Sequence, residues 1–253
     1  MAKTEWFVRT AWVVLIFLAA SCTANLEVRK NQEEASRNLG EEYMKIGDFT
    51  AALKEFLEAE KLYDQDPILQ TYLGITYMAK EKVDLAIVHF KKALAVKPDY
   101  APARNNLGFA FLATKDWDAA IDCFKKLSED LLNPTPHYPL LNLGWAYYNK
   151  KDYRLAEKYY LEALKSAPGF VVAQVGLGRT YLAMGRVREA LELLEKAAKN
   201  SPRFPDVYFE LGKGYQLSGE HTKAVTAYGK VVELAPDSPL AREAKKEAEN
   251  IKR

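Results

Sequence analysis

Residues 73–90 read LGITYMAKEKVDLAIVHF, and the order of residue types in this stretch decides the fold. A leucine precedes Gly74, Tyr77 follows the glycine by three positions, Ala86 by twelve and Phe90 by sixteen. A closely similar order surrounds five further glycines, so that the series is Gly40, Gly74, Gly108, Gly144, Gly178 and Gly212. The spacings between them are 34, 34, 36, 34 and 34 residues. A period of this size indicates an array of small units stacked side by side.

Each unit is predicted to be a pair of antiparallel helices. The apolar positions within a unit are three, four and seven residues apart, which is the spacing of one helix face. Most units end with a proline, which lacks an amide donor and disfavours helical geometry in the residue before it: Pro98, Pro168, Pro202 and Pro236. Turn signals between the two helices are Gly47, Gly185 and Gly219. Since neither helix can bury its apolar stripe alone, every unit needs neighbours.

These recurring residues resemble the tetratricopeptide repeat (TPR) family over residues 33–236. The resemblance implies an all-α fold, a right-handed α-solenoid of six helical hairpins, followed by a C-terminal capping helix over residues 237–253. Ser238 is the expected N-cap of that last helix and Pro239 a first-turn residue. The sequence departs from the family early in each first helix, where the usual large aromatic is replaced by Ser36, Gln70, Arg104, Leu140, Gln174 or Tyr208. The first unit also lacks its closing proline, because Asp64 stands there.

Residues 1–21 are predicted to be a lipoprotein signal peptide. A basic start precedes an apolar run over residues 12–20, which is too short to span a bilayer comfortably and ends in small residues typical of a cleavage site. An apolar run, small residues and then Cys22 resemble the lipobox of bacterial lipoproteins. The resemblance implies that Cys22 is acylated and becomes the mature N-terminus; the alternative is an ordinary signal peptide cut nearby.

Lipidation of Cys22 would place the protein in the cell envelope. Residues 22–32 are then a lipidated N-terminus and a short polar tether, and more than one acyl chain gives stable anchoring in a membrane. The residue directly after the cysteine is Thr23 and not an acidic residue. By analogy with lipoprotein sorting, this favours the outer membrane, with the protein facing the periplasm.

No pattern in the sequence indicates catalysis, a small-molecule substrate, a metal site or a cofactor. The histidines His89, His137 and His221 lie in different units and lack the spacing of a zinc site. Cys123 is expected to be a small buried apolar side chain. Removal of residues 1–21 lowers the formal charge from +2 to +1, and lysines and glutamates are interspersed, which argues against nucleic acid binding. The sequence therefore predicts a non-enzymatic protein.

In TPR proteins the first helices of successive units line a concave groove, and the family's ligand-facing positions can be carried onto this chain. They give an apolar and aromatic centre in units two to four, with amides around it and charges at the ends. Tyr138 is added from an insertion before unit four. This insertion bends the superhelix, presents Tyr138 to a ligand, or is a tolerated loop expansion; the sequence leaves these alternatives open. The predicted groove residues are Ile75, Asn105, Phe109, Leu112, Tyr138, Asn142, Trp145, Tyr148 and Arg179.

This groove is predicted to bind a segment of a partner protein. A desolvated aromatic centre with a polar rim is typical of a binding hot spot, and it favours an extended or helical segment with apolar side chains over an acidic tail. Leu112 and Met78 have an alternative role in packing between neighbouring units. Trp145 and Phe109 are expected to be exposed, because their positions face ligands in the family.

A lipidated envelope protein of six TPRs resembles the pilotins, lipoproteins of type IV pilus biogenesis. The resemblance implies a protein that escorts the pilus secretin to the outer membrane and promotes its ring assembly. The groove would hold a segment of the unassembled subunit while the lipid delivers both to the membrane. Two alternatives stay open from the sequence: a scaffold lipoprotein of outer-membrane protein insertion or polysaccharide export, and an adaptor for cell-wall enzymes.

Overall fold

The computed structural model describes residues 25–130 and 134–252 of the 253-residue chain. In these ranges every regular element is a helix: one helix spans residues 25–45, and α2 to α13 follow. Their bounds are α2 Phe49–Leu62, α3 Pro67–Ala79, α4 Val83–Val96, α5 Ala101–Ala113, α6 Trp117–Ser128, α7 His137–Asn149, α8 Tyr153–Ser166, α9 Val171–Ala183, α10 Val187–Asn200, α11 Pro205–Leu217, α12 His221–Leu234 and α13 Pro239–Lys252. The predicted all-α fold with two helices per repeat is confirmed.

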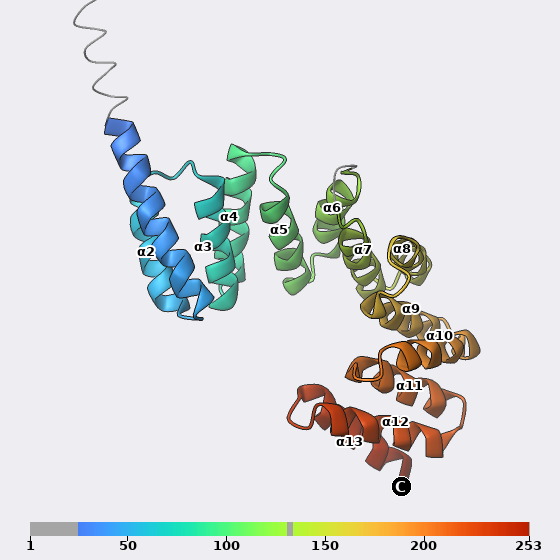
Figure 1. Ribbon diagram of the computed structural model, residues 1–253. Helices are drawn as coiled ribbons and strands as arrows, with labels where there is room; N and C mark the ends of the chain where they lie inside the picture. The colour runs from blue at the N-terminus through green and yellow to red at the C-terminus, as the bar shows by residue number, and fades with distance from the viewer. Residues whose placement is uncertain (1–24, 131–133, 253) are drawn as a thin grey trace, which may run out of the picture. The chain divides into compact units, whose positions relative to one another are not determined.

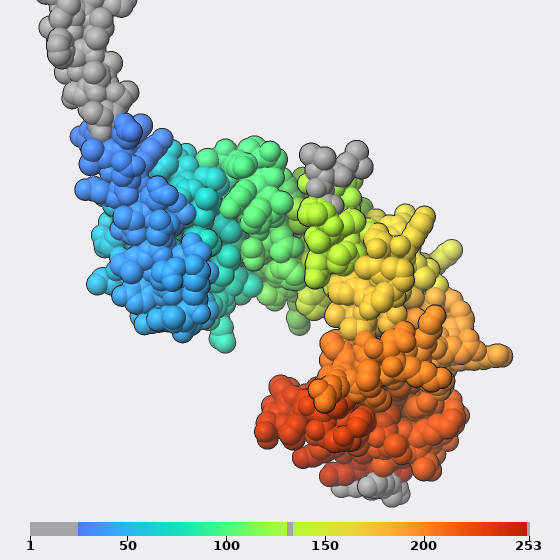
Figure 2. Space-filling view, in the orientation of Figure 1, coloured from blue at the N-terminus to red at the C-terminus, as the bar shows by residue number. Residues whose placement is uncertain are grey.

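The chain divides into two compact units, each of which is larger than a single hairpin repeat. The first unit extends to Thr114 and the second begins at Lys115. In the first unit α3 packs against α2, α4 and α5, and in the second each helix from α6 to α13 packs against the next (Figure 1). Side chains fill the spaces that separate the ribbons within each unit (Figure 2). Among the described residues, no helix is both long enough and apolar enough to cross a bilayer. The predicted signal peptide and Cys22 lie outside the described residues.

The recurring glycines lie where a large side chain of the second helix crosses the first helix. The pairs are Gly40–Phe56, Gly74–Phe90, Gly144–Tyr160, Gly178–Leu194 and Gly212–Tyr228. A Cβ atom added at Gly212 would come within 2.5 Å of the Tyr228 ring. Glycine is required here because any side chain would occupy the space of the residue sixteen positions later.

The turns inside the hairpins use a left-handed residue seven positions after the recurring glycine. Gly47, Gly185 and Gly219 have φ values of 81°, 75° and 80°, which confirms the predicted turns. In the other three turns the same conformation is adopted by Glu81, Lys115 and Lys151, with φ values of 59°, 61° and 66°. The left-handed region costs a non-glycine residue about 1–2 kcal/mol, so the flanking helices hold these turns against local preference.

Capping residues and prolines fix the N-terminal ends of α13 and α3. The Ser238 hydroxyl accepts a hydrogen bond from the Ala241 amide at 3.0 Å and Pro239 is the first residue of α13, as predicted. The first repeat lacks a proline at Asp64, and the chain turns slightly later. Asp66 caps α3 by accepting from the Ile68 amide at 2.8 Å, and Pro67 opens the helix.

The first helix differs from the sequence prediction of a polar tether up to residue 32. Helix is present from residue 25, and residues 25–32 are all exposed. Two contacts explain why these residues are helical: Arg29 donates to the Lys61 carbonyl at 3.2 Å, and the Lys30 ammonium lies 4.8 Å from the centre of the Tyr63 ring. The N-terminal turns therefore rest on the end of α2, and helix replaces the predicted tether over residues 25–32.

A buried polar network replaces the missing aromatic of the second repeat. Gln70, fully buried, donates through Nε2 to Glu60 at 3.0 Å and to the Asp64 carbonyl at 3.1 Å. Its Oε1 atom lies 2.8 Å from Nδ1 of His89. Because Oε1 can only accept, Nδ1 of His89 must carry the proton. Lys92 closes the network by donating to Glu60 at 2.9 Å.

We expect this network to make the first unit less stable in mild acid. Burial lowers the pKa of the His89 imidazole below its ordinary 6.5; Glu60 opposes this effect and Lys92 adds to it. The unfolded chain then binds the proton more readily, so the stabilising contribution is complete above about pH 7 and is lost as the pH falls below 6.5. The measurement is the free energy of unfolding of the parent protein and of the His89→Gln variant between pH 8 and 5.

The variant is needed as a reference because Glu33 acts in the opposite direction over the same range. Burial, with the neighbouring Asp66 carboxylate, raises the pKa of Glu33 to about 7. Its folded state holds the proton more tightly, so Glu33 adds stability as the pH falls. The difference between parent and variant isolates His89, and a difference that stays constant with pH would contradict the assignment.

Candidate functional site

The first unit contains four of the predicted groove residues. Ile75 on α3 and Asn105 and Phe109 on α5 are half-buried, so part of each surface is open to a ligand. Leu112 is only 6% exposed. Its assignment to the groove is therefore corrected: Leu112 is a core side chain, as its alternative packing role implied.

The second unit contains the other five predicted groove residues, of which Trp145 is the most informative. Trp145 is 42% exposed on α7, which confirms the expectation that it is accessible. Tyr148, half-buried, lies three residues later and therefore on the same face of the helix. Asn142 is 7% exposed, so its prediction as an amide that faces a ligand is wrong. Helix α7 packs against α6, α8 and α9, and this packing leaves little of the Asn142 side chain accessible.

Tyr138 lies in the first turn of α7 and is 52% exposed. Its ring meets the edge of the Phe170 ring at a centroid distance of 5.4 Å, and His137 contacts both rings. Residues 131–133 of the insertion lie outside the described residues. Tyr138 is thus accessible, but it also joins the start of α7 to the residue that precedes α9.

Arg179, the last predicted groove residue, lines a cavity of about 400 Å³ between α7, α9 and α11. Its Nε atom donates to Oε1 of Glu210 at 2.8 Å, and Nζ of Lys213 lies 3.6 Å from the same oxygen. Tyr148 and Leu182 supply aromatic and apolar wall. Burial raises the pKa of the Tyr148 phenol against the influence of the Arg179 charge, so the hydroxyl stays protonated and able to donate.

Glu210 was not predicted, although it controls the electrostatics of this cavity. It is fully buried, and its Oε2 atom has no hydrogen-bond partner among the described residues. The signal was present in the sequence. Two positions before the recurring glycine, the other repeats carry Asn38, Tyr72, Asn106, Asn142 and Gly176, and only this one carries a carboxylate. A charge buried at a packed position is costly unless it is paired, which marks it as a candidate functional residue.

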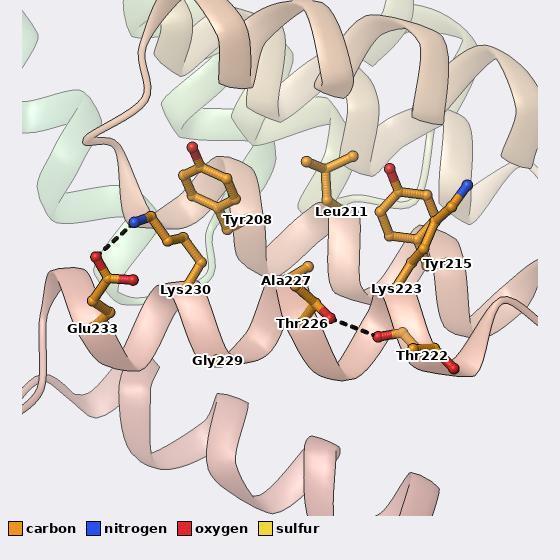
Figure 3. A pocket seen from close by; sticks show the side chains of 10 residues that line it. All are labelled: Tyr208, Leu211, Tyr215, Thr222, Lys223, Thr226, Ala227, Gly229, Lys230 and Glu233. Carbon is orange, nitrogen blue, oxygen red and sulfur yellow. Dashed lines mark hydrogen bonds and ion pairs between the residues drawn. The ribbon is translucent and has the colours of Figure 1, made fainter.

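A second hollow of about 510 Å³ lies over α11 and α12, and no predicted residue belongs to it. Figure 3 shows Tyr208, Leu211 and Tyr215 on α11 facing the side chains of α12. Gly229 lies exposed in the middle of α12, and a Cβ atom there would meet nothing within 4 Å. The other repeats place Leu57, Lys91, Lys125, Leu161 and Glu195 at this position. The hollow is open because this repeat alone lacks a side chain there.

The described residues offer no evident centre for catalysis. No group of three or more His, Cys, Asp or Glu side chains in the described ranges could hold a metal ion. Cys123 is buried at 5% exposure, in agreement with its expected packing role. Aromatic and apolar side chains line the two cavities together with a few charged groups. Such a lining suits the binding of a polypeptide segment.

Comparison with known families identifies the repeated unit. Models described as tetratricopeptide repeat match residues 37–94, 147–208 and 182–248, and a TPR repeat model matches residues 74–115. Among curated relatives, anaphase-promoting complex subunit 6 of Arabidopsis thaliana is 24% identical over 171 residues, which is 66% of this chain and 31% of the relative. Subunit cut9 of the same complex in Schizosaccharomyces pombe is 31% identical over 144 residues, 53% of this chain and 21% of cut9. The chain thus spans a third or less of either protein.

This chain covers nearly the full length of several solved structures, in contrast to the curated relatives. PilW, a widely conserved type IV pilus biogenesis factor, has a TM-score of 0.74 at 23% identity, covering 84% of this chain and 98% of PilW. PilF of Pseudomonas aeruginosa has a TM-score of 0.68 at 18% identity, covering 87% of this chain and 99% of PilF. YrrB, a TPR protein with an unusual peptide-binding site, has a TM-score of 0.53 at 22% identity, covering 76% of this chain and 97% of YrrB. At these identities the similarity establishes the fold alone.

Proposed function

The chain belongs to the tetratricopeptide repeat family, and from this premise we propose that it is a lipid-anchored scaffold of the bacterial envelope that holds a segment of a partner protein. Trp145 is the observation that carries the proposal. A tryptophan left 42% exposed on a helix that buries Leu143, Ala146 and Tyr147 presents apolar surface that a partner can cover. Tryptophan is also enriched among residues that dominate binding energy.

The best candidate for the partner is a subunit of the secretin of type IV pili. Two observations support this choice: PilW, a type IV pilus biogenesis factor, has the same fold over 98% of its length, and the N-terminal sequence predicts lipidation at Cys22. The scaffold would bind a segment of the unassembled subunit and bring it to the outer membrane through the acyl chains. The function is one of binding and delivery, without a chemical step.

The test measures binding of the purified secretin subunit from the same genome to the mature protein. Trp145→Ala is expected to weaken this binding by about 30-fold or more, because a buried tryptophan anchor contributes at least about 2 kcal/mol. The shift of tryptophan fluorescence on binding, or calorimetry, gives the affinity. In cells, Cys22→Ser is expected to release the protein from the membrane fraction and to abolish surface pili.

Leu161→Ala is the matched control, since Leu161 is 46% exposed on α8, the second helix of the same hairpin. Its binding should equal that of the parent. Normal pili in a strain that lacks the gene, together with no affinity for the secretin subunit, would rule out the pilus role. Capture of an outer-membrane insertion factor or a cell-wall enzyme through Trp145 would instead support one of the alternative partners.

A further inference from the structure

The cavity between α7, α9 and α11 carries an excess of positive charge. Its lining contains two cationic side chains, Arg179 and Lys213, and one anionic side chain, Glu210. Both cations approach the same carboxylate oxygen, at 2.8 and 3.6 Å. One negative charge cannot neutralise two positive ones, so the lining keeps one positive charge that a ligand can complement.

The guanidinium of Arg179 is arranged so that its outer donors stay available. Arg179 uses Nε to bind Glu210, and among the described residues no hydrogen bond or ion pair of its two Nη groups is found. The side chain is 35% exposed and lines the cavity. Glu210 acts as a positioning residue, because it is fully buried and fixes the guanidinium without occupying the cavity with a flexible group.

We propose that this cavity binds the carboxylate of an aspartate or glutamate side chain within the partner segment, held by Arg179 and Lys213. The proposal deepens the proposed function, on which it rests, by giving the segment one acidic residue beside its apolar anchor. Paired Nη donors match the two oxygens of a carboxylate, and the Lys213 ammonium adds a second positive charge. Tyr148 and Leu182 keep part of the cavity apolar, which strengthens the ion pair relative to one in open water.

The spacing of the helices predicts where the acidic residue lies in the partner. Trp145 is on α7 and Arg179 on α9, and these two helices pack against each other. Packed helices have axes about 8–10 Å apart, and an extended chain advances about 3.3 Å per residue. The carboxylate should therefore follow or precede the apolar residue at Trp145 by about three residues.

The experiment selects random 12-residue peptides displayed on phage against the complete mature protein. Enriched peptides should carry an aspartate or glutamate about three residues from an aromatic or aliphatic residue. One selected peptide is then synthesised in three forms: with its acidic residue, with the matching amide in its place, and with an amidated C-terminus. The amide form is expected to bind about 10- to 100-fold more weakly, as for loss of a hydrogen bond to a charged group, whereas C-terminal amidation should change nothing.

Two variants test the residues. Arg179→Met and Lys213→Met should each reduce binding of the acidic peptide and leave binding of its amide form unchanged, and Lys213→Met serves if the first variant is unstable. Arg188→Met is the matched control, because Arg188 has a side chain that is 92% exposed and pairs with Glu192 on its own helix. Raising the salt concentration should weaken the acidic peptide more than the amide form.

The outcomes separate this inference from the proposed function. Apolar peptides enriched without an acidic residue, with binding lost in Trp145→Ala, would overturn the carboxylate site and leave the scaffold function intact. Loss of binding on C-terminal amidation would place the carboxylate at a chain end and overturn the assignment to a side chain. If no peptide is enriched, the carboxylate site is overturned, whereas the scaffold function stands or falls with the binding of the secretin subunit.

Discussion

Replacement of Phe90 with alanine is expected to lower the free energy of unfolding of the first unit by about 3–5 kcal/mol. Phe90 is fully buried on α4, and its ring lies over Gly74 on α3. Because glycine has no side chain and the helix backbone is rigid, nothing nearby can move in to fill the space. The loss therefore combines the transfer energy of the ring with the energy of a cavity.

Urea unfolding followed by circular dichroism measures this loss, and amide hydrogen exchange in α3 and α4 locates it. Val88→Ala is the matched control on the same helix, since Val88 is 48% exposed and its truncation should change stability by no more than about 0.5 kcal/mol. A loss below about 1 kcal/mol for Phe90→Ala would show that the ring does not fill the contact between the two helices.

Substitution of Gly212 by alanine is expected to destabilise the second unit by about 1–3 kcal/mol, although alanine is the better helix former by up to about 1 kcal/mol. The added methyl group would lie within 2.5 Å of the Tyr228 ring. That ring cannot move aside easily, because it is fully buried, its edge packs against Phe209 at 5.7 Å between centroids and its hydroxyl donates to Gln216 at 3.1 Å. Thermal and urea unfolding measure the effect.

The same hairpin supplies a control with the opposite sign. Gly229→Ala adds a methyl group where nothing lies within 4 Å, so the variant should gain about 0.5–1 kcal/mol from helix propensity alone. The pair thus compares one chemical change at two helical positions. If both variants were destabilised equally, backbone conformation rather than the Tyr228 ring would explain the recurring glycine.

Much of the fold could be predicted because its determinants are local. The glycine and the large residue sixteen positions later belong to one hairpin, as do the turn glycines and the closing prolines. The non-glycine turns at Glu81, Lys115 and Lys151 gave no such signal, since the flanking helices impose that conformation. The helical residues 25–32 were missed for a similar reason, because contacts with α2 stabilise them.

The candidate site was less predictable, because exposure depends on residues a repeat away. The family positions correctly indicated that Trp145 is accessible, and the predicted groove residue Arg179 lies in the wall of a cavity that the sequence did not predict. They failed for Leu112 and Asn142, whose side chains are only 6% and 7% exposed. The ligand-facing positions of the family did not include Glu210 or Gly229, although each differs in residue type from the residues at the same position in the other repeats.

The amino-acid sequence by itself determined the repeat, the two helices of each repeat, the three glycine turns and the helix-contact glycines, since these follow from spacings of 3 to 16 residues that one hairpin satisfies internally. Tertiary structure decided which side chains remain open to a partner and how charges combine. Arg179 and Glu210 are 31 residues apart in the chain and 2.8 Å apart in space. Packing of α9 against α11 creates that distance. The same kind of packing decides which side chains are buried in the core and which stay accessible to a partner.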